Sequence, residues 1–313
     1  MNARSSHVRI IAKLCAGTAV ALAALTVAPN AREPAPVVLA SVMQDQCDRM
    51  AGSPYDQNRN TAYAPVGIEE IDTEAVTACR IAFEATHNPR FAYQLGRALN
   101  RTQEADQAMT AYETAVNADY SAAKVNFGML MGRMGDTSTE FKMYSEAAAT
   151  GNVLAAYNLG VAYRDGLGTD KNGEKALSWF EKAAAGGDST AAFNIGAMYD
   201  EGDLVAEDNQ LAIAWYDIAA KRGNADAMIN LGLMYQAGEG IAANPQAAAE
   251  MYAEAAAAGD SFGALKLKEM QDAGVVPAPA PDVATTDHTP KGGIDMLVLQ
   301  EGDVEIPSTL LSI

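Results

Sequence analysis

The chain has 313 residues, of which 49% are apolar but only 7% aromatic, and a formal net charge of -18 at pH 7. This composition, rich in alanine, favours helices that pack closely through small side chains. The acidic surface excludes nucleic acid and anionic lipid as main partners, because both carry the same sign of charge.

Residues 1–40 form the predicted signal peptide and cleavage region. Arg4, Arg9 and Lys13 precede an uncharged run over residues 14–28. An apolar core of about 15 residues behind a basic end is typical of a secretory signal and is short for a membrane span. We expect export to the periplasm or the exterior, without stable membrane insertion after cleavage. An uncleaved anchor is the alternative.

Residues 41–87 form a lead-in and a capping half-repeat. Turn formers such as Gly52 dominate up to Thr73, where the pattern predicts a helix N-cap and no helix before it. Removal of the signal leaves Cys47 and Cys79, and an even pair in an oxidising compartment indicates a disulfide. Two unpaired thiols are the alternative.

A self-similar array follows, with two units over residues 88–150 and three over residues 151–272 with a C-terminal cap. In the last three units the tripeptide Asn-Leu-Gly or Asn-Ile-Gly recurs every 36 residues, and each unit closes on a glycine. A fixed period of this size indicates stacked units that bury their apolar faces against each other. The mid-helix glycines are expected to allow close approach of the helices: Gly160, Gly196 and Gly232. The closing glycines are expected to form left-handed turns: Gly187, Gly223 and Gly259.

In the units a large apolar residue and glycine, such as Leu95-Gly96, are followed by alanine, an aromatic residue and alanine at offsets that resemble the tetratricopeptide repeat. Over residues 151–258, the pattern Tyr-x-x-Gly-x-Gly with Ala-x-x-Trp-Phe-x-x-Ala-Ala resembles the longer Sel1-like repeat. The resemblance implies an all-α fold, a right-handed α-solenoid of antiparallel helix pairs. The second unit departs from the pattern at Glu140, where a small residue is expected.

Enzymatic motifs are weak. Ser121 and Lys124 match the S-x-x-K pattern of penicillin-recognising enzymes, but neither S-D-N nor K-T-G follows. Cysteine-rich Sel1-like proteins are associated with β-lactam binding or hydrolysis, but they pair cysteines within each repeat. We therefore predict a non-enzymatic protein with no catalytic residue, metal or cofactor, and keep a β-lactam-binding or hydrolysing enzyme as the alternative.

The predicted function is a scaffold or adaptor, a monomer that binds a protein or peptide segment in the solenoid groove. In tetratricopeptide arrays, a polar residue two places before the helix glycine often holds the bound peptide. Here that position is an amide, which can donate and accept, in every unit: Gln94, Asn126, Asn158, Asn194 and Asn230. Alternatively, each amide ties its own repeat to the next.

Four arginines in an otherwise acidic protein form a second candidate site: Arg90, Arg97, Arg101 and Arg133. They could receive a carboxylate, a phosphate or an acidic partner segment. Local pairing with nearby acids, including those of the lead-in, is the alternative. The family resemblance implies roles in envelope signalling or polysaccharide secretion.

Residues 273–313 form a Pro/Ala-rich linker and tail. Its apolar stretches, at residues 296–299 and 309–313, are interpreted as a frayed end. The alternative is a peptide ligand for the protein's own groove or for a partner.

Overall fold

The computed structural model describes residues 36–276, and the regular elements in this range are all helical. The predicted signal peptide, apart from its last five residues, and the predicted tail from residue 277 lie outside the described residues. The elements are α1 (Pro36–Ala51), the 3-10 turn η1 (Ile68–Glu70), α2 (Glu74–Thr86), α3 (Pro89–Arg101), α4 (Ala105–Asn117), α5 (Ser121–Arg133), α6 (Thr137–Ala149), α7 (Val153–Asp165), α8 (Gly173–Ala185), α9 (Ser189–Glu201), α10 (Asn209–Lys221), α11 (Ala225–Ala237), α12 (Pro245–Ala257) and α13 (Ser261–Asp272).

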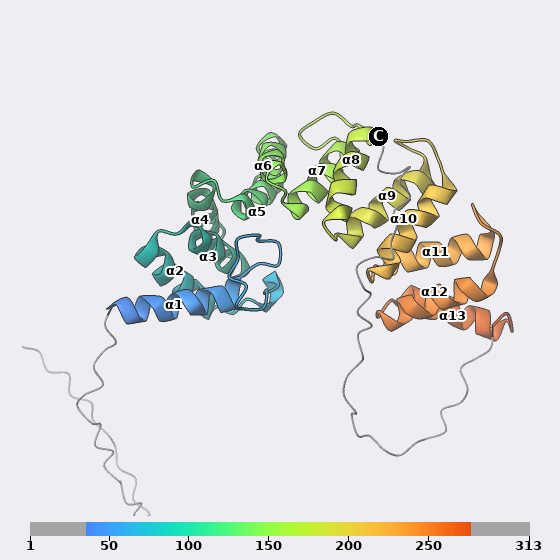
Figure 1. Ribbon diagram of the computed structural model, residues 1–313, viewed down its shortest axis with the longest axis horizontal. Helices are drawn as coiled ribbons and strands as arrows, with labels where there is room; N and C mark the ends of the chain where they lie inside the picture. The colour runs from blue at the N-terminus through green and yellow to red at the C-terminus, as the bar shows by residue number, and fades with distance from the viewer. Residues whose placement is uncertain (1–35, 277–313) are drawn as a thin grey trace, which may run out of the picture. The chain divides into compact units, whose positions relative to one another are not determined.

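Helices α2 to α12 each contain 13 residues. A helix of this length is marginal in isolation, so its stability comes from packing. Consecutive helices pack as hairpins along the chain (Figure 1). Within residues 36–276, no helix is long and apolar enough to cross a membrane.

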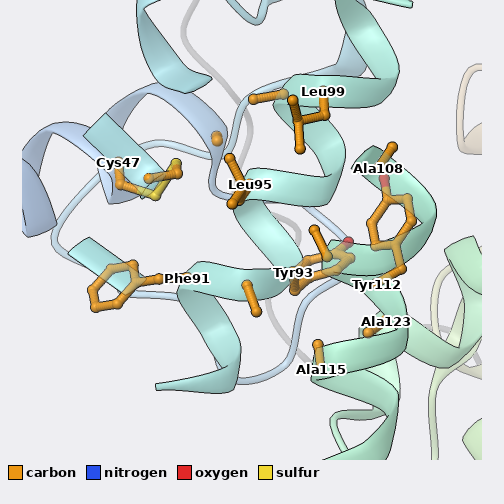
Figure 2. Packing of buried hydrophobic residues seen from close by; sticks show 14 of the residues in the cluster. Cys47, Phe91, Tyr93, Leu95, Leu99, Ala108, Tyr112, Ala115 and Ala123 are labelled. Atoms are coloured by element: carbon orange, nitrogen blue, oxygen red, sulfur yellow. A yellow bond between two sulfur atoms is a disulfide. The ribbon is translucent and has the colours of Figure 1, made fainter. Parts of the chain in front are cut away.

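The described residues divide into two compact units between Ala191 and Ala192, and each unit has its own core. In the first unit one buried cluster extends from α1 to α5, and Figure 2 shows Tyr93 and Tyr112 at its centre. A second cluster joins α5, α6 and α7. In the second unit, Tyr252 of α12 packs with Met270 of α13.

The mid-helix glycines allow the close approach that the sequence predicts. A Cβ atom at Gly160 would lie 2.4 Å from the ring of Phe180. At Gly96 a Cβ would lie 2.5 Å from the ring of Tyr112, and two further repeats show the same arrangement. In four of the five repeats the aromatic ring of the second helix thus lies directly on a glycine of the first helix, where any side chain would displace it. At Gly128 the corresponding ring, that of Tyr144, is further away, at 3.1 Å from the position of a Cβ.

The closing glycines take the left-handed conformation that was predicted for them. Their φ angles are 95° at Gly187, 83° at Gly223 and 94° at Gly259. At the first of these turns, the amide of Asp188 donates to the carbonyl oxygen of Ala183 over 3.1 Å. This bond satisfies a helix-end carbonyl and turns the chain sharply into the next helix.

The prediction that the lead-in has no helix before Thr73 is wrong, because α1 extends to Ala51 and packs against α2. The expected half-repeat therefore has a partner helix. The turn formers begin only at Gly52, directly after α1 ends. At α2 the side chain of Thr73 caps nothing; instead Asp72 Oδ1 accepts from the amide of Glu74 over 3.1 Å.

The predicted disulfide is present between Cys47 of α1 and Cys79 of α2, with an S–S distance of 2.04 Å. Both cysteines are fully buried, and Figure 2 shows the bond at the edge of the first core cluster. It fixes α1 to the second helix of its own hairpin.

The departure at Glu140 is compensated by Gly132 on the facing helix α5. A Cβ at Gly132 would lie 2.3 Å from the Glu140 carboxyl group, so the missing side chain provides the room that this residue needs. The hydroxyl of Tyr144 donates to Glu140 Oε1 over 2.8 Å. The second unit therefore packs with a large residue on α6 and a small one on α5.

Candidate partner-binding groove

Arg97, predicted as a partner contact, holds the protein's own lead-in. Its Nη1 atom donates to the carbonyl oxygen of Ala51 over 2.6 Å and its Nη2 atom to that of Val66 over 2.7 Å. Only 4% of the residue is exposed. The amide of Val66 in turn donates to Gly52 O over 2.7 Å, which closes residues 52–66 into a loop. We call this segment the lead-in loop.

Gln94 and Arg90 also contact the lead-in, through the buried carboxylate of Asp48 on α1. Gln94 Nε2 donates to Oδ1 and Arg90 Nη2 to Oδ2, each over 3.0 Å. Gln94 Oε1 lies 2.9 Å from Cys47 Sγ, a contact rather than a hydrogen bond because a disulfide sulfur carries no proton. Local pairing with the acidic lead-in is therefore what the structure shows for Arg90.

The tip of the lead-in loop reaches α5 and the turn between α6 and α7. The hydroxyl of Tyr120 donates to Asp56 Oδ2 over 2.7 Å, and Gln57 Nε2 donates to Gly151 O over 2.7 Å. Burial raises the pKa of Asp56, although the hydrogen bond from Tyr120 acts in the opposite direction. The loop is thus held at its two ends by Arg97, and its tip is held at the start of α5 and at the turn before α7.

Two of the predicted amides connect successive repeats. Asn126 Nδ2 donates to the hydroxyl of Tyr112 over 3.1 Å, and Asn230 is hydrogen-bonded to the hydroxyl of Tyr216. In both pairs the tyrosine belongs to the preceding repeat. This is the structural alternative for the amide positions, in which each amide joins neighbouring repeats.

The remaining two amides are Asn194 and Asn158. Asn194 is 8% exposed. The Nδ2 atom of Asn158 is buried and has no hydrogen-bond partner within residues 36–276. Of the amides, Asn126 alone borders a described hollow together with predicted arginines.

That hollow has a volume of about 500 Å³ and lies between the lead-in, α3 and α5. It brings together four of the predicted residues, namely Arg97, Arg101, Asn126 and Arg133. The lead-in and two helices also contribute to its lining, through Tyr55, Glu69, Met129 and Leu154. We call this hollow the α3–α5 groove.

The groove has a basic rim. Arg101 Nε is 3.9 Å from Glu69 Oε2, and these side chains are 43% and 86% exposed, so the pair is weak. Arg133 is exposed and forms no ion pair or hydrogen bond with another residue of the described range. Its guanidinium group is therefore available to a ligand.

The S-x-x-K motif does not form a nucleophile and base. Ser121 Oγ lies 2.8 Å from the hydroxyl of Thr150, while Lys124 Nζ pairs with Asp119 and Glu146. Burial alone would lower the pKa of Lys124, but the two acids raise it above its ordinary value. A lysine held as a cation does not accept the serine proton. In the described range no cluster of histidine, cysteine and acidic residues is placed to hold a metal.

Short helices stacked as hairpins, with glycine and alanine at their contacts, define the class as helical-repeat proteins of the scaffold type. The family model of the Sel1 repeat matches residues 153–188, 189–224 and 225–260. Residues 153–260 of the chain therefore consist of three Sel1 repeats.

Solved structures share the fold. A protective antigen from uropathogenic Escherichia coli is 23% identical with a TM-score of 0.62, over 80% of this chain and 54% of the antigen. The chain thus spans about half the length of that protein. A Sel1 repeat protein from Oxalobacter formigenes is 25% identical with a TM-score of 0.58, over 67% of this chain and 86% of its own. A comparison with curated proteins gives no match.

From the sequence, pairing of the α3 arginines with acids of the lead-in was only an alternative, and the particular acids were not identified. The signal was present in the acids Asp48 and Asp56, which are uncommon as buried residues unless paired. Both acids lie in the lead-in. In the folded chain Asp48 binds Arg90, and Asp56 lies near the same arginine.

Proposed function

We propose that this protein is a non-catalytic scaffold that captures an extended segment of a partner protein in the α3–α5 groove. The observation that carries the proposal is the joint presence of an unpaired cation, Arg133, and exposed apolar side chains at one hollow. Met129 is 44% and Tyr55 52% exposed. Exposed apolar groups beside a free cation are typical of interaction surfaces.

The groove has room for an extended segment. A further hollow of about 400 Å³ shares Tyr55 and Leu154 with the α3–α5 groove and continues to the turn at residues 186–190. In this proposal Arg101, Arg133 and Asn126 contact the partner directly. Gln94, Arg90 and Arg97 act indirectly, because they hold the lead-in that forms one side of the groove.

The cellular setting is part of the proposal. The Cys47–Cys79 disulfide supports export to the periplasm or the exterior, because such bonds persist in oxidising compartments. We propose that the exported scaffold serves envelope signalling or polysaccharide secretion as a monomer. Fractionation of cells that express the tagged chain, with non-reducing electrophoresis, tests the location; a reduced protein in the cytosolic fraction contradicts it.

A peptide selection tests groove capture. The full chain is panned against a displayed library of random dodecapeptides, and the enriched peptides are measured against Met129→Glu and Leu265→Glu. Leu265 is 52% exposed on α13 and provides a matched control for the substitution. We expect Met129→Glu to abolish binding and Leu265→Glu to preserve it. Absence of enrichment, or equal effects of both variants, refutes capture in this groove.

The enzymatic alternative has its own test. The purified chain is incubated with a chromogenic β-lactam, and we expect no turnover because Lys124 is held as a cation. Turnover that is lost in Ser121→Ala refutes the scaffold proposal.

A further inference from the structure

A second hollow adjoins the α3–α5 groove at Arg133, and it is apolar. It has a volume of about 450 Å³, and Met109, Leu130 and Met134 line it. Arg133 and Asn100 border both hollows. Arg133 therefore borders two hollows, one that contains Met129 among polar side chains and one that is mainly apolar but also contains Asp106.

The apolar side chains around this cation are mostly methionines. Met129 of α5 is 44% exposed, and Met134, which caps the end of α5 directly after Arg133, is 71% exposed. Methionine is flexible and polarizable, so it adapts to partner side chains of different shape. Two exposed methionines beside one arginine provide apolar contact and charge recognition within a single helical turn and a half.

The charge of the site selects the sign of the ligand. A guanidinium group binds a carboxylate through two parallel hydrogen bonds, and no acid within residues 36–276 occupies Arg133. The net charge of -18 disfavours a polyanion such as nucleic acid. A short acidic segment is tolerated, because charges further away than about 8 Å are screened at physiological salt.

From these observations we infer that the partner segment is both acidic and apolar. Its aspartate or glutamate carboxylate binds Arg133, assisted by Arg101. Large apolar residues on the two sides of this acid contact Met129 in the α3–α5 groove and Met134 in the adjoining hollow. This inference rests on the proposed function and specifies the chemistry of the partner.

Glu69 is a competitor within the protein. Its carboxylate faces Arg101 at 3.9 Å and is 86% exposed, so a partner acid can replace it at little cost. Removing its charge with Glu69→Gln leaves Arg101 free for the partner. Binding of an acidic segment is then expected to become about threefold tighter, which corresponds to a weak surface pair.

The test is a change of specificity by charge reversal. The dodecapeptide library is selected on the full wild-type chain, on Arg133→Glu and on Lys142→Glu. Lys142 is 70% exposed on α6 and borders none of the described hollows, so its variant makes the same charge change elsewhere. Circular dichroism verifies that each variant keeps its helices.

The wild type and Lys142→Glu are expected to enrich peptides with an acidic residue next to leucine, phenylalanine or methionine. Arg133→Glu is expected to enrich peptides with a basic residue at that position instead. Wild-type peptides should bind Arg133→Glu at least about tenfold more weakly, as for a lost charge-assisted hydrogen bond. Groove-dependent peptides that lack an acid, or an unchanged preference in Arg133→Glu, overturn the inference while the proposed function stands. Failure to enrich any groove-dependent peptide overturns both.

Discussion

Replacement of Arg97 by methionine tests whether this residue holds the lead-in or binds a partner directly. The side chain keeps much of its volume and loses both hydrogen bonds, to Ala51 O and to Val66 O. Hydrogen bonds from a charged donor contribute about 1.5 to 3 kcal/mol each, and the bonds are not fully additive. We expect the free energy that keeps the lead-in loop closed to fall by about 3 kcal/mol.

Hydrogen exchange at the amide of Val66 measures this loss directly, because that amide donates to Gly52 O at 2.7 Å and closes the loop. A loss of about 3 kcal/mol makes exchange through local opening roughly a hundredfold faster. The helices from α10 onward should keep their protection, since the hydrogen bonds shown above hold the tip of the lead-in loop at the start of α5 and at the turn before α7.

The matched control is Arg101→Met on the same helix. Its side chain is 43% exposed, and its ion pair within residues 36–276 is with Glu69, at 3.9 Å. This variant should weaken the binding of acidic peptides without changing the rate of hydrogen exchange at the Val66 amide. If Arg97→Met leaves that exchange rate as it is and still reduces peptide binding, then Arg97 contacts the partner directly and the role given to the lead-in is wrong.

Three further changes test the packing. Gly160→Ala places a Cβ 2.4 Å from the Phe180 ring, so an overpacking cost of about 1 to 3 kcal/mol outweighs a helix-propensity gain of about 1 kcal/mol. Urea unfolding should show a net loss of stability, and a gain in stability contradicts the packing. Gln103→Gly relieves a positive φ of 65° and should raise stability by about 1 kcal/mol in the same assay, and an unchanged midpoint argues against strain. Replacing Cys47 and Cys79 together by alanine should cost about 4 kcal/mol in the chain-entropy picture for a separation of 32, and a loss below about 1 kcal/mol refutes it.

The repeat architecture was predictable because it depends on local patterns. The spacing of Gly160 and Phe180 within one unit, repeated three times, identifies two facing helix positions without knowledge of the fold. The closing glycines were predictable for the same reason, since a left-handed residue after a helix favours glycine. Helix α1 was missed because it crosses the expected boundary at residue 40, so its apolar residues were divided between a signal region and a lead-in.

The site was predictable only in part, because its contacts are distant in the sequence. Arg97 binds Ala51 and Val66, which are 46 and 31 residues away, and no local pattern identifies such a pair. The predicted arginine cluster lies in the first two units, where the structure buries some of its members and leaves others exposed. Arg101 and Arg133 lie at the ends of α3 and α5 and remain exposed, whereas Arg97 lies one turn earlier and is covered.

The lead-in loop gives the first repeats a surface that stacked hairpins alone do not have. A bare first helix offers a row of side chains, but here Tyr55 and Glu69 from the lead-in face Met129 and Arg133 from α5 across one hollow. The groove is therefore composed of segments that are distant in the sequence and come together only in the folded chain. The Arg97 hydrogen bonds hold the lead-in on α3, and the disulfide holds α1 on α2. It follows that isolated repeats taken from residues 151–272 lack this groove, even though they match the Sel1 repeat best. If the proposed capture holds, the specificity for the partner depends on the least regular part of the chain, where side chains are not constrained by the repeat.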